Sequence, residues 1–435
     1  MSGNRKFLSL QLMTVHDILL AMEAVKNKLW TKDFTIITLG TVVSMLGNAV
    51  AGFAIGLIVL DYTNSIFLYA LFMVCYSLPR IVLPMFAGPI LDRFPRRRVI
   101  YTLDFISCGL YLIIYLLLLK DYFNYASYLV ISMLIGSIDS VYSVAYDSFY
   151  PTLISEGNFT RAYSIASLIY PLSSAIMVPI AGVCYKSIGL APLFLFNAVT
   201  FLIAAIAETR IKARESHAEN RAQERFDNTR FLRDLKDGVS YLKRERGLSA
   251  ISWYFFITML TNSVCLTLAL PYFKALPNAD GVMQYAFVMG ASTIGRLLGG
   301  GIHYFYRYPA AKKYAIAVAV YISICFIDGA YMFFPFWAML LFMFCDGVLG
   351  VTSYNIRISG TQNYLPDEMR GRFNGLFQML CILGTIIGQL LAGALGEKLP
   401  IRGIVASAMA FNLLGVFFVM IPNGKHVRKI YNVNA

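Results

Sequence analysis

The sequence predicts an all-α membrane protein with twelve transmembrane helices in two pseudo-symmetric six-helix bundles. Hydrophobic residues make up 58% of the 435 residues and charged residues only 14%, against roughly 25% charged residues in soluble domains. The apolar residues also form long runs, and one long polar stretch near the middle divides these runs into two equal groups. This composition excludes an ordinary soluble fold, because such a fold needs a polar surface in water.

The apolar runs are long enough to cross a bilayer, which takes about 20 residues as a helix. Backbone groups in lipid need hydrogen bonds within their own segment, and the runs lack the alternation of barrel strands, so we expect helices. The predicted spans are about 34–60, 66–88, 99–119, 126–147, 162–184, 190–208, 249–272, 283–302, 314–333, 336–356, 373–396 and 402–421. The predicted domains are a cytoplasmic lead (1–33), a first bundle (34–208), a cytoplasmic linker (209–248), a second bundle (249–422) and a cytoplasmic tail (423–435).

The basic residues predict the orientation. Segments on the side of both termini hold 30 of the lysines and arginines, and the opposite loops hold 5. This asymmetry places both termini in the cytoplasm. It also accounts for the net charge of +13 without nucleic acid, so we expect the lipid bilayer as partner and a monomeric chain.

The N-terminal lead has two interpretations. Its first part, from Phe7 to Met22, is mildly apolar but contains Gln11, His16 and Asp17 and is followed by no small-residue cleavage site, so it is not a signal peptide. It is either an amphipathic helix on the membrane surface or a segment ahead of the true start. In the second case the chain begins at Met22 instead of Met1.

The two halves of the sequence are related. The segment 153–161 resembles 364–372 at an offset of 211 residues, and the same offset pairs Gly88 with Gly299 and Gly182 with Gly393. Duplicated halves are common in transporters, which bind substrate between the halves near the bilayer midplane.

The loop between the second and third spans carries the strongest motif. It places a glycine before an Asp-Arg pair and a basic cluster, and its residues are Gly88, Asp92, Arg93, Arg96, Arg97 and Arg98. An aspartate at a helix end can pair with arginine or with a helix N-terminus, in a contact that breaks when the conformation changes. Asp104, further along the third span, is expected to pair with the arginines. This loop resembles the signature of the major facilitator superfamily, with Pro95 in place of the usual glycine.

Further segments resemble the macrolide-efflux and enterobactin-exporter branch of that superfamily. They are Trp30–Phe34, Tyr76–Pro79, Pro151–Ala162 and Leu195–Ala198. The resemblance implies a cell-membrane exporter of a small molecule, driven by protons. The glycine-rich antiporter motif of the fifth span is only partial, because Ser173, Ser174 and Met177 stand where small glycine-like residues are expected.

Ionisable residues within spans are costly and therefore indicate function. The resemblance places spans one, two, four, five, seven, eight, ten and eleven around the cavity, so Asp139 and Asp346 are the first candidates for binding protons or a cationic substrate. The other substrate or proton candidates are Arg80, Arg296, Asn48 and Gln389. Asp104 and Asp328 fall on peripheral spans, where a structural role is expected.

Other functions lack their motifs. The chain has no phosphate-binding G-x-x-x-x-G-K-[ST] loop and no G-x-S-x-G or H-E-x-x-H. Its seven cysteines lie singly in apolar runs and its four histidines are scattered, so we expect no metal site and no cofactor. An amphipathic, drug-like substrate, a siderophore and a lysophospholipid all stay open. A membrane enzyme such as an acyltransferase would need a clustered histidine site, which the sequence lacks.

Overall fold

The structure is a computed structural model that describes residues 28–81, 83–84, 94–155, 158–213, 236, 238–277, 280–305 and 308–432. The predictions for the lead up to residue 27, for Gly88, Asp92 and Arg93, and for most of the linker lie outside these residues. All regular secondary structure within the described ranges is helical. The all-α fold class predicted from the sequence is therefore confirmed.

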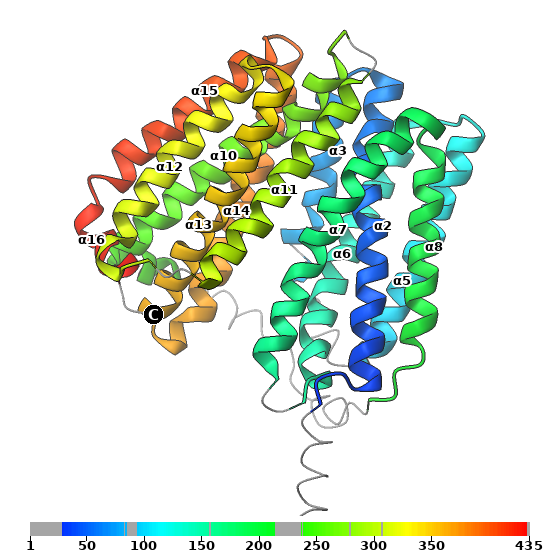
Figure 1. Cartoon of the computed structure of the whole chain (residues 1–435), viewed down its shortest axis with the longest axis horizontal. Coiled ribbons are helices and arrows are strands. Elements are labelled where there is room, and N and C mark those ends of the chain that lie inside the picture. The colour runs from blue at the N-terminus through cyan, green and yellow to red at the C-terminus, as the bar shows by residue number, and fades with distance from the viewer. Residues whose placement is uncertain are drawn as a thin grey trace, which may run out of the picture.

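The helices fall into two groups of six, which stand side by side (Figure 1). The first group is α2 (Lys32–Thr63), α3 (Ile66–Ser77), α5 (Arg96–Leu119), α6 (Tyr125–Phe149), α7 (Phe159–Ile188) and α8 (Ala191–Glu208). The second group is α10 (Arg246–Lys274), α11 (Gly281–Phe305), α12 (Lys313–Ala330), α13 (Phe336–Tyr364), α14 (Asp367–Gly396) and α15 (Ile401–Gly415). A π-helical turn (Val416–Met420) continues α15 and leads to the short α16 (Gly424–Tyr431).

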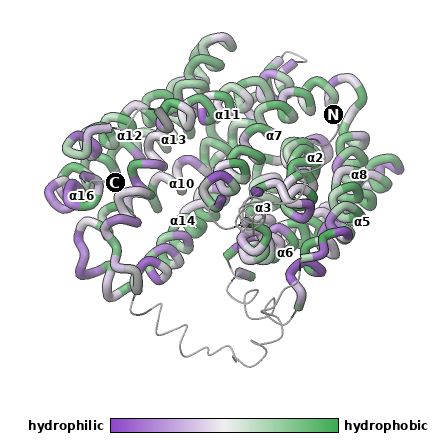
Figure 2. The backbone as a smooth tube through the Cα atoms, turned by 60° about the horizontal axis from the view of Figure 1, so that its bottom comes forward, coloured by the Kyte–Doolittle hydropathy of each residue, from purple (hydrophilic) through white to green (hydrophobic). Residues whose placement is uncertain are grey.

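Most of these helices can cross a membrane. Among the described residues, ten helices are long and apolar enough to do so. The described part of α3 is shorter, and α11 has the length but is less apolar because it carries Gln284, Arg296 and His303. Figure 2 shows hydrophobic residues along most of the helices and hydrophilic residues around α16. The chain is a multi-pass membrane protein.

Polar residues at the span boundaries begin the helices. The side chains of Thr31, Ser65 and Asn124 accept hydrogen bonds from backbone N–H groups in the first turns of α2, α3 and α6. Such caps satisfy donors that a helix leaves free at its N-terminus. The turn between α2 and α3 passes through Asn64 at a φ of 51°. The sequence thus ends each span where a short turn reverses the chain.

The most extensive contacts between the two groups of helices are α7 with α11 and α3 with α14. A Cβ added at Gly182 of α7 would lie 2.5 Å from the Cβ of Ala286, and one added at Gly393 of α14 would lie 2.6 Å from the Cβ of Ala70. The sequence repeat pairs these two glycines at an offset of 211 residues. The duplication therefore sets equivalent close helix contacts on both sides of the interface.

Replacing Gly393 with leucine should destabilise the protein by about 1–3 kcal/mol, because overpacking a close contact forces neighbouring atoms apart. Gly375→Leu on the same helix is the control, since nothing lies within 4 Å of a Cβ at that position. Chemical unfolding of the purified variants measures the difference. Equal unfolding midpoints for the two variants would contradict the proposed contact.

Candidate functional site

The candidate site begins where two helices of the first group touch backbone to backbone. Gly136 of α6 lies so close to the carbonyl oxygen of Tyr76 on α3 that a side chain would not fit between them. This approach sets Asp139, one turn further along α6, beside Tyr76. The Tyr76 hydroxyl donates a hydrogen bond of 2.5 Å to Oδ2 of Asp139. A hydrogen bond to a charged acceptor is stronger than one between neutral groups.

Arg80 completes this first set. It lies one turn after Tyr76 on the same helical stretch, and its guanidinium carbon is 5.6 Å from the centre of the Tyr76 ring. It also interacts electrostatically with Asp139. The structure therefore brings together two of the residues singled out in the sequence, Arg80 and Asp139, and adds Tyr76 as the group that positions the carboxylate.

The second group of helices repeats the arrangement. Gly347 of α13 lies against the backbone of Ser292 and Arg296 on α11, which brings the neighbouring Asp346 to α11. The Ser292 hydroxyl lies 3.5 Å from Oδ2 of Asp346, and Arg296 interacts electrostatically with the same carboxyl group. An aspartate, a hydroxyl group and an arginine thus recur in both halves.

The repeat extends to the spacing of these residues. Tyr76 precedes Arg80 by four positions, as Ser292 precedes Arg296, and an offset of 216 residues relates the two pairs. This spacing puts the hydroxyl and the arginine on the same face of each helix. The sequence contains this signal, but the offset of 211 residues that pairs the glycines does not align Tyr76 with Ser292, so it does not reveal their shared role.

Asp328 belongs to the second set, although the sequence placed it on a peripheral span. Its side chain is 7% exposed, and its Oδ1 has no hydrogen-bond partner among the described residues. It interacts electrostatically with both Asp346 and Arg296. The second set therefore has two carboxyl groups for one arginine, whereas the first set has one of each.

Gln389 and Asn48 lie differently. Gln389 of α14 reaches across to the first group of helices, where its Nε2 donates to the Ser77 hydroxyl at 3.3 Å, next to Tyr76. Its Oε1 is buried and has no partner in the described part of the chain. Asn48 is partly exposed on α2. Gln389 is thus the candidate that joins the two groups beside the first set.

The arginines of the loop motif contact the ends of neighbouring helices. Arg96 donates to the carbonyl oxygen of Ser148 at 3.0 Å, and Arg97 donates to that of Ile211; Arg98 is exposed. The predicted pairing of Asp104 with these arginines is wrong: both of its oxygens lack such a partner, and its carboxyl group faces Glu208. The reason is the rotation of α5, which turns Asp104 toward α8. A latch through Asp92 stays a prediction.

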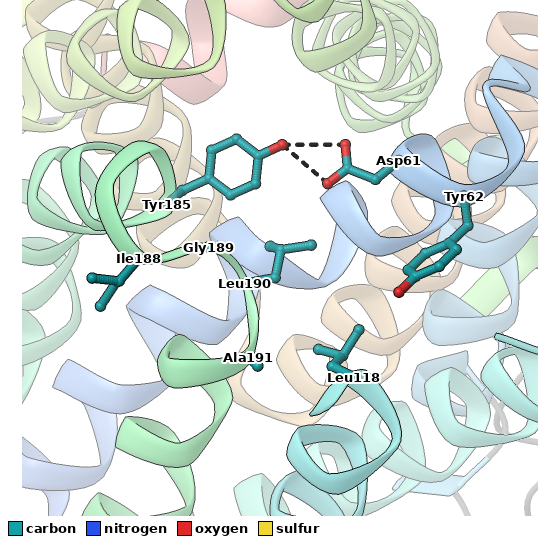
Figure 3. A pocket seen from close by; sticks show the side chains of 8 residues that line it. All are labelled: Asp61, Tyr62, Leu118, Tyr185, Ile188, Gly189, Leu190 and Ala191. Atoms are coloured by element: carbon teal, nitrogen blue, oxygen red, sulfur yellow. Dashed lines mark hydrogen bonds between the residues drawn. The ribbon is translucent and has the colours of Figure 1, made fainter. Parts of the chain in front are cut away.

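Charged contacts hold the two groups together at the end of the bundle where α2 ends and α3 begins, here called the distal end. Lys274 of α10 lies 2.7 Å from Oδ1 of Asp61 on α2. The Tyr185 hydroxyl of α7 points at both oxygens of Asp61, 3.0 and 3.2 Å away (Figure 3). Lys186 pairs with Asp280, which precedes α11. Asp61 and Tyr185 also line a pocket of about 490 Å³.

Glu397 makes another distal contact between the groups. Its carboxylate, at the end of α14, accepts hydrogen bonds from the Ser65 hydroxyl and from the Phe67 N–H in the first turn of α3. The Ser65 hydroxyl and the Phe67 N–H lower the pKa of Glu397. The distal contacts therefore include a pairing of α14 with the N-terminus of α3, where a negative charge is favourable.

This contact should depend on pH. A carboxyl group whose pKa is lowered by folding stabilises the folded state above its ordinary pKa of about 4.3, and the contribution disappears as the pH falls through the lowered value. We expect Glu397→Gln to unfold at a lower temperature than the parent protein at pH 7, and the difference to shrink on acidification below about pH 4. Thermal unfolding across this range measures it. A difference of constant size would argue against the carboxylate contact.

Comparison with known proteins adds to this geometry. The sequence model of the Major Facilitator Superfamily matches residues 37–388. Macrolide efflux protein A of Streptococcus pyogenes is 22% identical over 390 residues, which cover 88% of this chain and 93% of that protein. Enterobactin exporter EntS of Shigella boydii is 23% identical over 393 residues, which cover 89% and 91%.

The fold has solved counterparts. The crystal structure of the nucleoside transporter NupG superposes with a TM-score of 0.71 at 10% sequence identity, and covers 89% of this chain and 98% of that one. At this identity the likeness concerns the fold alone. It agrees with the arrangement of two six-helix groups.

Proposed function

Because this chain belongs to the Major Facilitator Superfamily, whose members carry small molecules across membranes, we propose that it exports an amphipathic small molecule in exchange for protons. The observation that carries this proposal is the aspartate, hydroxyl and arginine set present in each half of the protein. Membership in a transporter family also distinguishes the chain from the membrane enzyme considered above. The proposed location is the cell membrane, with both termini in the cytoplasm.

The chemistry of the two sets suits proton exchange. A hydroxyl donor and an arginine beside a carboxyl group favour its charged form, so the group takes up a proton more readily when either neighbour moves away. Tyr76 and Asp139 lie on different helices, as do Ser292 and Asp346. A change in the distance between these helices therefore strengthens or weakens the contact between the hydroxyl and the carboxyl group. Protonation of Asp139 or Asp346 is thereby linked to the conformation of the transporter, and a cationic or hydrogen-bonding substrate competes for the same carboxylate.

The distal contacts support alternating access. The ion pairs that join the two groups of helices within the described residues, Asp61 with Lys274 and Lys186 with Asp280, lie at the distal end, and the groups diverge toward the other end in Figure 1. Under the orientation expected from the positive charges, this conformation is closed toward the outside. Export then requires these contacts to open once substrate has bound from the cytoplasmic side.

The names of the relatives support export and leave two substrate classes. A macrolide-like amphipathic compound is the first candidate, and a siderophore is the second because the enterobactin exporter aligns along 91% of its length. A lysophospholipid, which the sequence left open, is named by neither relative. Accumulation of erythromycin, ethidium and enterobactin in a pump-deficient bacterial host distinguishes the first two classes.

The expected result is lower accumulation of at least one compound in cells that make this chain, with the difference abolished by an uncoupler. Cells that make the Asp139→Asn, Asp346→Asn double variant at equal membrane levels are the control. If cells that make this chain accumulate every compound to the same level as cells that make the double variant, the result would count against export of these classes. Lower accumulation that survives the uncoupler would count against coupling to protons.

A further inference from the structure

Two carboxyl groups that the mechanism above does not use face each other inside the first group of helices. Asp104 of α5 is 1% exposed, and Glu208, the last residue of α8, is fully buried. The two groups lie within hydrogen-bonding reach of each other. Their four oxygens have no donor among the described residues.

Tyrosine hydroxyls surround this acid pair, and no basic side chain of the described residues donates a hydrogen bond to either acid. From α6, Tyr142 interacts electrostatically with both acids and Tyr146 with Glu208, and the hydroxyl groups of both tyrosines are buried near the Thr41 hydroxyl. From α2, a Cβ at Gly40 would lie 3.1 Å from Oε1 of Glu208. Arg97, on α5 itself, donates to the backbone of Ile211.

Two adjacent carboxylates cannot both stay ionised when they are buried without a counterion, because each disfavours the charge of the other. We propose that Asp104 and Glu208 share one exchangeable proton. The proton forms an O–H bond to one carboxyl group and a hydrogen bond to the other, which leaves a single negative charge on the pair. The Tyr142 and Tyr146 hydroxyls are placed to turn toward the remaining oxygens.

The position of the pair connects it to the first aspartate set. Glu208 ends α8 on the side of the bundle where α2 begins, so the pair lies toward that surface. Tyr142 follows Asp139 by three residues on α6 and therefore shares its face of the helix, and its ring stacks on that of Tyr146, with the centroids 6.0 Å apart. Under the proposed function, we assign the route of the proton between the acid pair and Asp139 to this face of α6. This step rests on the proposed function, whereas the shared proton does not.

Infrared spectroscopy of the purified full-length protein tests the shared proton without any substrate. A protonated carboxylic acid has a carbonyl stretching band that a carboxylate lacks, and exchange into heavy water shifts it. At pH 7 we expect the parent protein to show such a band that is missing from both Asp104→Asn and Glu208→Gln. Asp147→Asn is the matched control, since Asp147 is an exposed aspartate on α6, and it should leave the band intact.

Four results would overturn the proposal. One is a parent spectrum without the band, and another is an unchanged band in both variants. The third is a band that disappears when sodium replaces potassium at constant ionic strength, which would assign the pair to a sodium ion. If the asparagine or glutamine variants do not fold, Glu208→Asp should keep the band at a shifted frequency, and an unshifted band would overturn the proposal. Failed transport with an intact band would refute the exporter function alone.

Discussion

Replacing either Asp139 or Asp346 with asparagine is expected to lower the rate of export by about tenfold or more. Each carboxylate is held by a hydroxyl and an arginine of a neighbouring helix, and a hydrogen bond to a charged group contributes about 1.5–3 kcal/mol. Asparagine keeps the size of the side chain but binds no proton at neutral pH. The asparagine variant therefore loses the charged contact with the neighbouring helix, and it also loses the group that exchanges a proton.

The control for this experiment lies on the same helix as Asp139. Asp147 is exposed on α6, two turns away, so Asp147→Asn removes the same charge without touching the hydroxyl–carboxylate pair. Initial rates of efflux from preloaded cells, normalised to the amount of protein in the membrane, measure the effect. Full activity of both Asp139→Asn and Asp346→Asn would remove these residues from the mechanism.

Reversing the charge of Asp61 or of Lys274 should open the distal end. Asp61 binds both Lys274 and the Tyr185 hydroxyl, so Asp61→Lys loses both contacts and adds repulsion. Only the Asp61–Lys274 contact joins the two groups; it is partly exposed and contributes on the order of 1 kcal/mol, and its loss together with the added repulsion should shift the ratio of open to closed molecules by about tenfold. The double reversal, Asp61→Lys with Lys274→Asp, should return the ratio toward its original value.

Spin labels on either side of the distal end report this change. Tyr122 and Leu399 are exposed on loops of the first and second groups of helices, and cysteines placed there in a chain without native cysteines carry the labels. A longer distance should appear in each single reversal and diminish in the double variant. An identical distance distribution in all variants would show that the ion pair does not hold the distal end closed.

The fold was predictable because lipid imposes it on the sequence. Only a helix satisfies its own backbone in the bilayer, so an apolar run such as 34–60 gives a helix, α2, with bounds within a few residues of the prediction. Asp139 and Asp346 stood out for the same reason, since charges within spans are rare. These predictions needed only the number and type of residues in each run.

The partners of the charged residues were not predictable, because they depend on how each helix is rotated about its axis. Asp104 follows three arginines along α5, which favours pairing within that helix, yet packing turns it toward Glu208. Asp328 was expected to have a structural role on a peripheral span, although it is buried and interacts electrostatically with Asp346 and Arg296. Glu208 was overlooked because it ends a span, where a charge is ordinary, and only the packing against Gly40 shows that it is buried.

The most direct test of proton-coupled export uses the purified protein in liposomes that contain a pH-sensitive dye. The transported compound, identified beforehand by the accumulation assay in cells, is added on one side of the membrane. Addition of the compound should move protons in the direction opposite to its flux, and an imposed pH gradient should drive the compound against its own gradient. The Asp139→Asn, Asp346→Asn double variant should do neither. The proposed exchange would be contradicted if the compound crossed the membrane at the same rate with and without a pH gradient and moved no protons.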